Sequence, residues 1–95
     1  MKKAILEITM QVSAANRPQA GAVYAKYKAP FLASVPGAES KELLLRDEDV
    51  QVVHQFASRD TAEKYLASTL FGVDVVEELK PYLAAAPDIR IYERQ

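Results

Sequence analysis

The sequence predicts a small α+β domain of the ferredoxin-like class, a split βαβ arrangement with the element order β-α-β-β-α-β and an antiparallel sheet. Three observations support this prediction. Residues 4–12 and 50–56 alternate between apolar and polar side chains, as half-buried strands do. Two longer stretches repeat apolar residues at three- and four-residue steps, which is typical of amphipathic helices. The acidic residues 47–49 separate two strand-like stretches, as a hairpin turn does. We expect a single domain over residues 1–95.

One strand and one helix are predicted for the first third of the chain. The strand, residues 4–12, places one apolar set on a single face: Leu6, Ile8, Met10 and Val12. Asn16 can cap the helix that follows, with Pro18 in the first turn, where a missing N–H matters least. The helix carries an apolar stripe made of Ala20, Val23, Tyr24, Tyr27 and Phe31. Because Pro30 cannot donate a hydrogen bond to the carbonyl of Lys26, we expect the regular helix to kink or end there.

Two strands joined by the acidic turn are predicted next. Pro36-Gly37 marks a turn before a second strand from about Ser40 to Arg46. The face that this strand buries is ambiguous, because residues 43–45 are three consecutive leucines. The third strand is clearer: one face has Val50, Val52, His54 and Phe56, and the other has Gln51, Val53 and Gln55. Its valine content suits a central strand.

A helix, a shorter helical piece and a strand complete the chain. Ser58 is the expected cap of the second helix, which should end at Gly72. The apolar side of this helix is made of Ala62, Tyr65, Leu66, Thr69 and Leu70. Asp74 is expected to open the shorter piece, which Pro81 interrupts, and residues 88–93 form the last strand. In this order the first and third strands are central, and the helices cover one face of the sheet.

The opposite face of the predicted sheet mixes polar and apolar side chains: Ile5, Glu7, Thr9, Gln11, Gln51, Val53 and Gln55. Such a face can be exposed to solvent, or it can form a wet, symmetric interface with a second sheet. The pattern alone leaves both options open. In the last strand, Arg90 and Tyr92 alternate with two isoleucines and are expected to serve a dimer contact.

Composition and charge exclude several classes of function. The 12 basic and 13 acidic residues nearly balance and the basic ones are scattered, so we expect no nucleic-acid partner. The absence of cysteine excludes disulfides, thiolate catalysis and cysteine-zinc sites. The N-terminal apolar run is broken at Glu7, too early for a secretory signal, and no segment approaches the roughly 20 apolar residues of a membrane span. We therefore expect a cytoplasmic protein without membrane contact.

The acidic residues Asp47, Glu48 and Asp49 could suggest a metal site. Consecutive carboxylates at a hairpin tip diverge, however, and nothing nearby in the sequence completes a coordination shell. We expect a solvated turn and no bound metal.

The chain resembles the antibiotic biosynthesis monooxygenase family, and more closely a bacterial branch of it. The resemblance covers nearly the whole chain and is carried by these words: Pro36-Gly-Ala, Asp49-Val-Gln-Val-Val-His54, Tyr65-Leu-Ala-Ser-Thr-Leu-Phe71, Asp74-Val-Val, Leu79-Lys-Pro and Ile89-Arg-Ile-Tyr92. It implies a ferredoxin-like domain that pairs sheet against sheet with a second copy into a dimeric α/β barrel. Some members oxygenate aromatic quinols or anthrones without metal or flavin, others degrade haem, and many have no known activity.

The sequence departs from the best-defined patterns of that family. The haem-degrading branch uses a helical histidine as iron ligand and a tryptophan beside the haem, whereas this chain has no tryptophan and its single histidine falls on a predicted strand. The quinol-oxygenating members place Asn, Trp, Tyr and Arg side chains around the substrate. Asn16 and several tyrosines match them in type but not position by position. We expect no cofactor.

His54 is the candidate catalytic residue, because an unperturbed histidine pKa near 6.5 allows proton transfer from a phenol or enol at neutral pH. The alternative is a partly buried histidine bonded to a neighbouring carbonyl or tyrosine. The candidate ligand-binding residues are Asn16, Tyr24, Tyr27, Phe56 and Tyr65. An aromatic-lined pocket with a few hydroxyls suits a flat aromatic ligand. The aromatic residues can equally be plain core, and Asn16 can be a helix cap and nothing more.

Two functions remain open at this point. The first is cofactor-independent oxygenation of a small phenolic or quinol compound, in which the activated substrate itself reacts with oxygen and the protein deprotonates it, holds it and excludes water. The second is a non-catalytic dimeric domain that binds a small apolar ligand or a protein partner. The absence from the sequence of a nucleophile–base pair, a glycine-rich phosphate loop and metal-ligand spacing favours the second.

Overall fold

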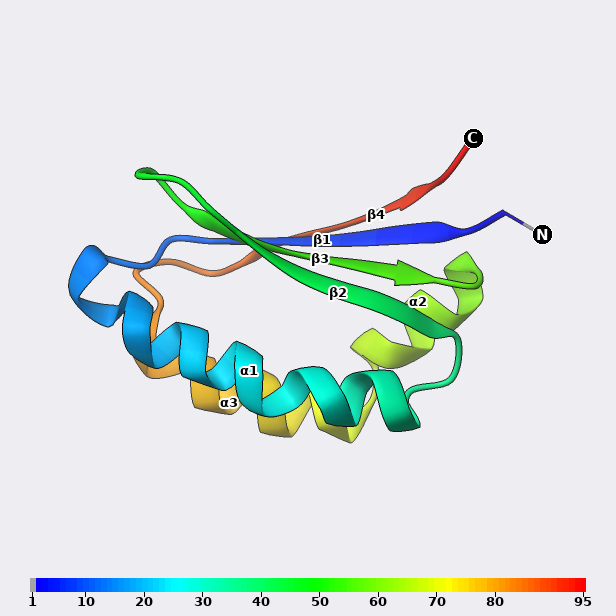
Figure 1. The fold of residues 1–95 in the computed structure, drawn as a ribbon, viewed down its shortest axis with the longest axis horizontal. Helices are drawn as coiled ribbons and strands as arrows, with labels where there is room; N and C mark the ends of the chain where they lie inside the picture. Colours follow the sequence, from blue (N-terminus) through cyan, green and yellow to red (C-terminus); the bar gives the residue numbers. More distant parts are fainter. Residues whose placement is uncertain (1) are drawn as a thin grey trace.

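The computed structural model describes residues 2–95 as one four-stranded antiparallel sheet with helices on one of its faces (Figure 1). The strand order is β2-β3-β1-β4, so the first and third strands are central, as predicted. The strands are β1 (Ala4–Met10), β2 (Ala38–Leu45), β3 (Val50–Phe56) and β4 (Asp88–Glu93). The helical elements are η1 (Ala14–Asn16), α1 (Arg17–Ser34), α2 (Arg59–Leu66), η2 (Leu70–Val75), α3 (Val76–Leu79) and η3 (Lys80–Tyr82). This confirms the predicted ferredoxin-like fold.

The central strands bury the predicted faces. In both β1 and β3, buried side chains alternate with half-buried ones. The buried set includes Leu6, Ile8 and Met10 of β1, and Val50, Val52, His54 and Phe56 of β3. Regular pairing in β1 ends at Met10, two residues earlier than predicted, although Val12 beyond it is also buried. Alternation along two neighbouring strands therefore determines one apolar layer that faces the helices.

Pairing with β3 resolves the ambiguous facing of β2. Lys41, Leu43 and Leu45 lie opposite the buried residues of β3, so they share its helix-covered face. Leu44 consequently lies on the open face of the sheet, where its side chain is 49% exposed. The strand also begins two residues before the predicted Ser40, with an irregularity between Ala38 and Ser40.

Helix α1 does not end at Pro30 but continues to Ser34. Pro30 is exposed, so water can solvate the carbonyl that it leaves unbonded, and the next residue, Phe31, is fully buried and holds the last turn against the sheet. At the other end, Asn16 occupies the cap position without a capping hydrogen bond from its side chain. Its backbone is helical because it closes the η1 turn, whereas capping requires extended backbone. The predicted Asn16 cap is therefore not formed.

The second helical region is capped as predicted but ends elsewhere. Ser58 and Thr61 form a reciprocal capping box at the start of α2. The helix itself ends at Leu66, and the chain coils again from Leu70 to Tyr82. Gly72 lies inside this second stretch and its N–H bonds to the carbonyl of Ser68 at 2.9 Å, so the prediction that Gly72 ends the helix is wrong. The predicted start at Asp74 is wrong for the same reason.

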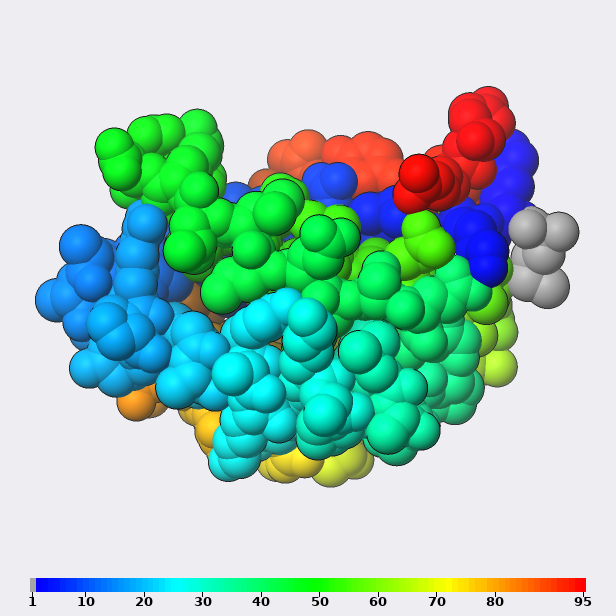
Figure 2. Space-filling view, viewed as in Figure 1, coloured from blue at the N-terminus to red at the C-terminus, as the bar shows by residue number. Residues whose placement is uncertain are grey.

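The core lies between the sheet and the helices and is centred on Phe31. The ring of this residue meets Phe56 edge-on, with centroids 5.5 Å apart, and Tyr65 with centroids 5.0 Å apart. Leu6 and His54 complete the most deeply buried group. Figure 2 shows α1 packed beside β2, with the tip of the β2–β3 hairpin projecting on the side away from the helices. Within residues 2–95, no helix is long and apolar enough to cross a membrane.

The open face of the sheet has the predicted mixed character. Gln51 donates a side-chain hydrogen bond to Thr9 at 3.0 Å, and both residues are half-buried. Leu44 and Tyr92 add large, half-exposed side chains at the two edge strands. Within residues 2–95, no helix lies on this face (Figure 1).

Candidate functional site

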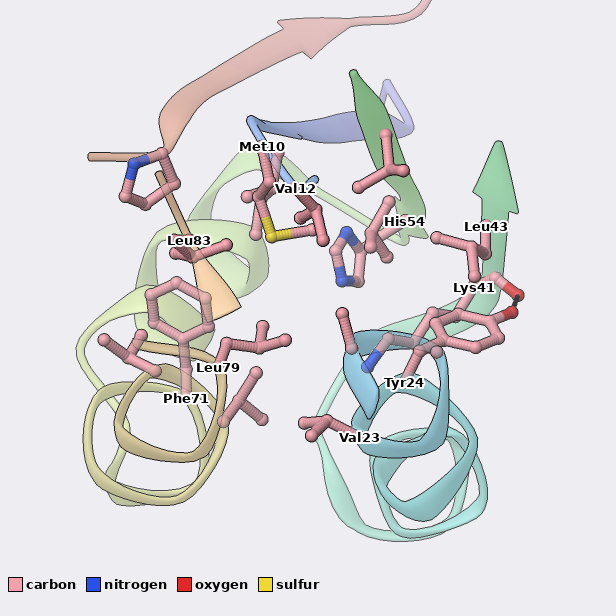
Figure 3. Close-up of a pocket in the computed structure, with 18 of the residues that line it drawn as sticks. Met10, Val12, Val23, Tyr24, Lys41, Leu43, His54, Phe71, Leu79 and Leu83 are labelled. Atoms are coloured by element: carbon pink, nitrogen blue, oxygen red, sulfur yellow. Dashed lines mark hydrogen bonds between the residues drawn. The ribbon is translucent and has the colours of Figure 1, made fainter. Parts of the chain in front are cut away.

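A narrow apolar pocket of about 60 Å³ lies between the sheet, α1 and the mostly helical residues 70–83 (Figure 3). Aliphatic and aromatic side chains form most of its wall, among them Met10, Val12, Val23, Phe71, Leu79 and Leu83. The pocket is partly open to solvent. Because a benzene-sized apolar cavity is about 150 Å³, an aromatic ring fits here only if side chains move or the ring extends through the opening.

His54 lies at the inner wall of this pocket and is only 1% exposed. Its Nδ1 is 3.1 Å from the carbonyl oxygen of Leu6, which can only accept, so Nδ1 carries the hydrogen and Nε2 holds the free lone pair. Burial lowers the pKa of His54 from 6.5 to about 4, and the charge of Lys41 acts in the same direction, against the Leu6 hydrogen bond. The ring is therefore neutral at physiological pH. It is bonded to a backbone carbonyl, as the alternative interpretation expects, and it also lines a pocket.

Lys41 is the functional candidate that sequence reasoning missed. Its side chain is 4% exposed and, within residues 2–95, makes no salt bridge or side-chain hydrogen bond. The ammonium lies 5.3 Å from the ring centre of Phe31 and 5.6 Å from that of Tyr24, in the range of cation–π contacts. Burial, assisted by the charge of Lys28, lowers the pKa of Lys41 from 10.5 to about 8. Figure 3 shows the Lys41 and His54 side chains directed into the space between sheet and helices.

The sequence contains one signal that could have revealed Lys41. Lys41 lies two residues before Leu43 and four before Leu45, so a strand that directs these leucines toward the helices directs the lysine the same way, although Leu45 at the end of the strand stays 63% exposed. The structure then ties the strand to α1, because the Tyr24 hydroxyl donates a hydrogen bond to the Lys41 carbonyl at 2.9 Å. Because residues 43–45 are all leucine, the sequence alone did not show which face of β2 points toward the helices.

Several solved protein structures share this fold. No protein-family model and no curated protein sequence match the chain. A candidate antibiotic biosynthesis monooxygenase from Bordetella bronchiseptica superposes with a TM-score of 0.87 at 12% identity, covering 100% of this chain and 99% of that one. A second candidate of the same description, from Caulobacter crescentus, gives a TM-score of 0.85 at 20% identity, covering 99% and 91%. The fold is that of the antibiotic biosynthesis monooxygenase-like proteins. The structural comparison confirms the fold that the resemblance in the sequence implies.

A third structure with this fold has a described activity. SnoaB from Streptomyces nogalater, a cofactor-independent oxygenase, superposes in a mutant form with a TM-score of 0.78 at 17% identity, covering 100% of this chain and 95% of that one. At this level of identity the likeness to SnoaB extends to the fold of the antibiotic biosynthesis monooxygenase-like proteins and no further.

Two of the predicted ligand-binding tyrosines join His54 at the pocket of this monooxygenase-like fold. Tyr24 is half-buried on α1, with its hydroxyl occupied by the Lys41 carbonyl. Tyr65 is 2% exposed on α2, and burial raises the pKa of its hydroxyl. Their rings form part of the aromatic wall that was expected.

The other three predicted ligand-binding residues lie outside the pocket wall. Tyr27 donates a hydrogen bond from its hydroxyl to the Glu78 carboxylate at 2.7 Å, which together with burial raises the pKa of Tyr27 and ties α1 to α3. Phe56 is fully buried in the core beside Phe31. Asn16 ends the η1 turn before α1. Helical periodicity identified the buried stripe correctly, but it could not separate pocket from core.

The acidic hairpin tip is a network of ion pairs. Arg46 bonds both carboxylate oxygens of Asp49, at 2.7 and 2.9 Å, and Glu48 at 2.8 Å. This pairing lowers the pKa of Asp49. Arg17 reaches across from α1 to the carbonyls of Arg46 and Asp47. Within residues 2–95, no cluster of three or more His, Cys, Asp or Glu side chains could hold a metal ion.

Proposed function

We propose that this chain is a cofactor-independent oxygenase that acts on a small phenolic or quinol compound bound in the pocket. The observation that carries the proposal is the pairing of two basic side chains, His54 and Lys41, within one apolar pocket. The fold shared with SnoaB, a cofactor-independent oxygenase, supports it. The pocket's apolar wall would exclude water from a reactive anion, as this chemistry requires.

The chemistry needs little from the protein. Removal of a proton from a phenol or an anthrone-type methylene makes an electron-rich anion, which passes electrons to molecular oxygen. In an anthrone the two methylene hydrogens leave with one oxygen atom as water, and the other oxygen atom is retained as a new carbonyl. In a phenol the ring C–H and the O–H hydrogens leave in the same way and a quinone forms, so neither reaction consumes an external reductant. The protein must accept the proton, hold the ring and keep the anion dry.

His54 is the proposed proton acceptor. Its Nε2 holds the free lone pair, because Nδ1 donates to the Leu6 carbonyl. A base with a pKa of about 4 is weak, so it takes a phenolic proton only where the resulting anion is strongly stabilised. The pocket must therefore contain a positive group close to the developing anion.

Oxygen uptake tests the proposal. Purified protein would be offered naphthols, quinols and anthrones, with uptake followed at an oxygen electrode and product oxygen traced by isotope labelling. We expect uptake above the protein-free rate for at least one compound, and at least a hundredfold loss of it in His54→Ala. Tyr27→Phe is the matched control, because it removes a hydroxyl outside the pocket wall. Equal rates in the wild type and His54→Ala would contradict the role of His54.

A non-catalytic binding domain is the second candidate. The structural hydrogen bond of His54 and its lowered pKa favour it. In this case a compound from the panel would raise the melting temperature without any oxygen uptake.

We also propose a homodimer formed through the open face of the sheet, where Leu44 and Tyr92 are half-exposed. Both candidate functions are compatible with that assembly.

A further inference from the structure

Lys41 differs from every other lysine within residues 2–95. Three lysines are paired with carboxylates: Lys3 with Glu39, Lys26 with Glu78 and Lys64 with Asp60. The remaining three, Lys2, Lys28 and Lys80, are exposed to water. Lys41 alone among the seven has a buried side chain and no acidic partner, and its ammonium nitrogen keeps only limited contact with solvent. A buried ammonium without a counter-charge costs several kcal/mol, so such groups are rare unless something offsets the cost.

The surroundings of the ammonium offset that cost only in part. The aromatic faces of Phe31 and Tyr24 attract the charge. Such contacts contribute about 2 kcal/mol when desolvated, less than the penalty for burying an ion. The cross-strand partner of Lys41, His54, is neutral and supplies no negative charge. The pKa of Lys41, lowered to about 8, still leaves most of the population charged at neutral pH.

The pocket is complementary to an anion. Its wall contains no aspartate or glutamate. Arg17, the other cationic residue at the wall, is already occupied by the backbone carbonyls of Val12, Arg46 and Asp47. Apart from His54 and the hydroxyls of Tyr24 and Tyr65, the rest of the wall is apolar. A ligand that satisfies this pocket therefore has a small apolar body and one negatively charged end.

We propose that Lys41 is an anion-binding residue and that the pocket takes a small aromatic molecule as its oxyanion, a phenolate or a carboxylate, with the charge at the ammonium. The identification of this anion as the substrate rests on the proposed function. The binding of the anion at Lys41 is independent of the proposed function. In the proposed reaction Lys41 is the positive group that a weak base such as His54 needs close to the developing phenolate.

The test is a binding experiment without turnover. Wild-type protein would be titrated calorimetrically near neutral pH with benzoate and with 4-nitrophenolate, whose absorbance reports its ionisation. The neutral counterparts are benzamide and 4-nitroanisole. Because a hydrogen bond to a charged group contributes about 1.5–3 kcal/mol, we expect the anions to bind roughly ten- to a hundredfold more tightly than their neutral counterparts.

Three variants isolate the charge. Lys41→Met keeps the length and apolar body of the side chain and should lose the anion preference, with neutral compounds bound within about twofold of wild type. Lys41→Arg should restore at least part of the preference. Lys28→Met is the matched control, since Lys28 lies over the same Tyr24 ring, 5.7 Å from its centre, but outside the pocket wall. It should leave anion affinity within about twofold of wild type. Should Lys41→Met fail to fold, Lys41→Gln replaces it.

The outcomes separate this inference from the proposed function. Equal anion affinity in the wild type and Lys41→Met, or wild-type preference for the neutral compounds, overturns the inference. Failure of the wild type to bind any of the four compounds overturns it as well. Anion binding that depends on Lys41 without oxygen uptake for any compound leaves the inference standing and contradicts the oxygenase proposal. Binding of only one of the two anions identifies which oxyanion the pocket accepts.

Discussion

Lys41 and His54 are direct partners across the β2–β3 ladder, and both side chains point into the layer covered by the helices. Two basic groups thus share one apolar environment. Burial lowers the pKa of each, and the charge of Lys41 lowers the pKa of His54 further. At neutral pH the pair carries a single positive charge, on Lys41.

The first prediction concerns stability at alkaline pH. The pKa of Lys41 is about 8 in the folded state and near 10.5 in the unfolded chain, so between these values the unfolded state binds more protons. The free energy of unfolding should therefore gain a contribution as pH rises from about 8 to about 10.5, amounting to roughly 3 kcal/mol at most. Lys41→Met should lack this rise and should be more stable than wild type near neutral pH. Urea unfolding at a series of pH values measures both, and a less stable Lys41→Met protein would contradict the prediction.

The second prediction concerns acid. The folded state holds His54 at a pKa of about 4, against 6.5 when unfolded, so its contribution to stability is complete above 6.5 and is lost as pH falls toward 4. The loss should reach roughly 3 kcal/mol. His54→Leu removes the titrating group, so the difference in unfolding free energy between the wild type and the variant should rise by that amount from about pH 4 to about pH 6.5. Carboxylates with a lowered pKa, such as Asp49, titrate in both proteins and cancel in the comparison. Parallel wild-type and variant curves would show that His54 is not buried in solution.

A third prediction compares two glycines. Gly37 has a φ of 79°, and a Cβ built there would lie 2.5 Å from Oγ1 of Thr61 in the α2 capping box. Gly37→Ala should therefore cost about 1–3 kcal/mol. Gly72 has open space around the same position, so Gly72→Ala should be neutral or stabilise the helical stretch by up to about 1 kcal/mol. Thermal and urea unfolding of the two variants give the comparison. Equal effects would exclude backbone strain at Gly37.

The fourth prediction concerns the dimer. Leu44 and Tyr92 lie on the open sheet face and are 49% and 48% exposed, so an aspartate at either position would place a charge in the proposed interface. We expect the wild type to sediment as two chains and both aspartate variants to sediment as one. Val73→Asp is the matched control, because Val73 is 56% exposed but lies on the helical stretch. A monomeric wild type would rule out the proposed assembly.

Two local signals for helix termination were overridden for a shared reason, although a kink at Pro30, the other expectation there, stays a prediction. Pro30 and Gly72 both favour termination, yet the chain stays helical past each. In each case buried side chains follow within a turn, Phe31 after Pro30 and Val75 after Gly72. Packing of an amphipathic face contributes more to helix stability than the propensity of one residue. Such packing depends on the opposing layer, which local sequence does not describe.

The sequence by itself determined the element order, the buried faces of β1 and β3, the Ser58 cap and the bounds of β4. These features depend on side-chain alternation and on contacts within a few residues, so the local sequence is sufficient to predict them. Only the tertiary structure decided that Lys41 is buried beside His54, because the facing of β2 follows from its register with β3 rather than from its three leucines. The sequence also could not predict the charge state of Lys41 and His54, because the pKa of a buried group depends on how much water the surrounding layers exclude.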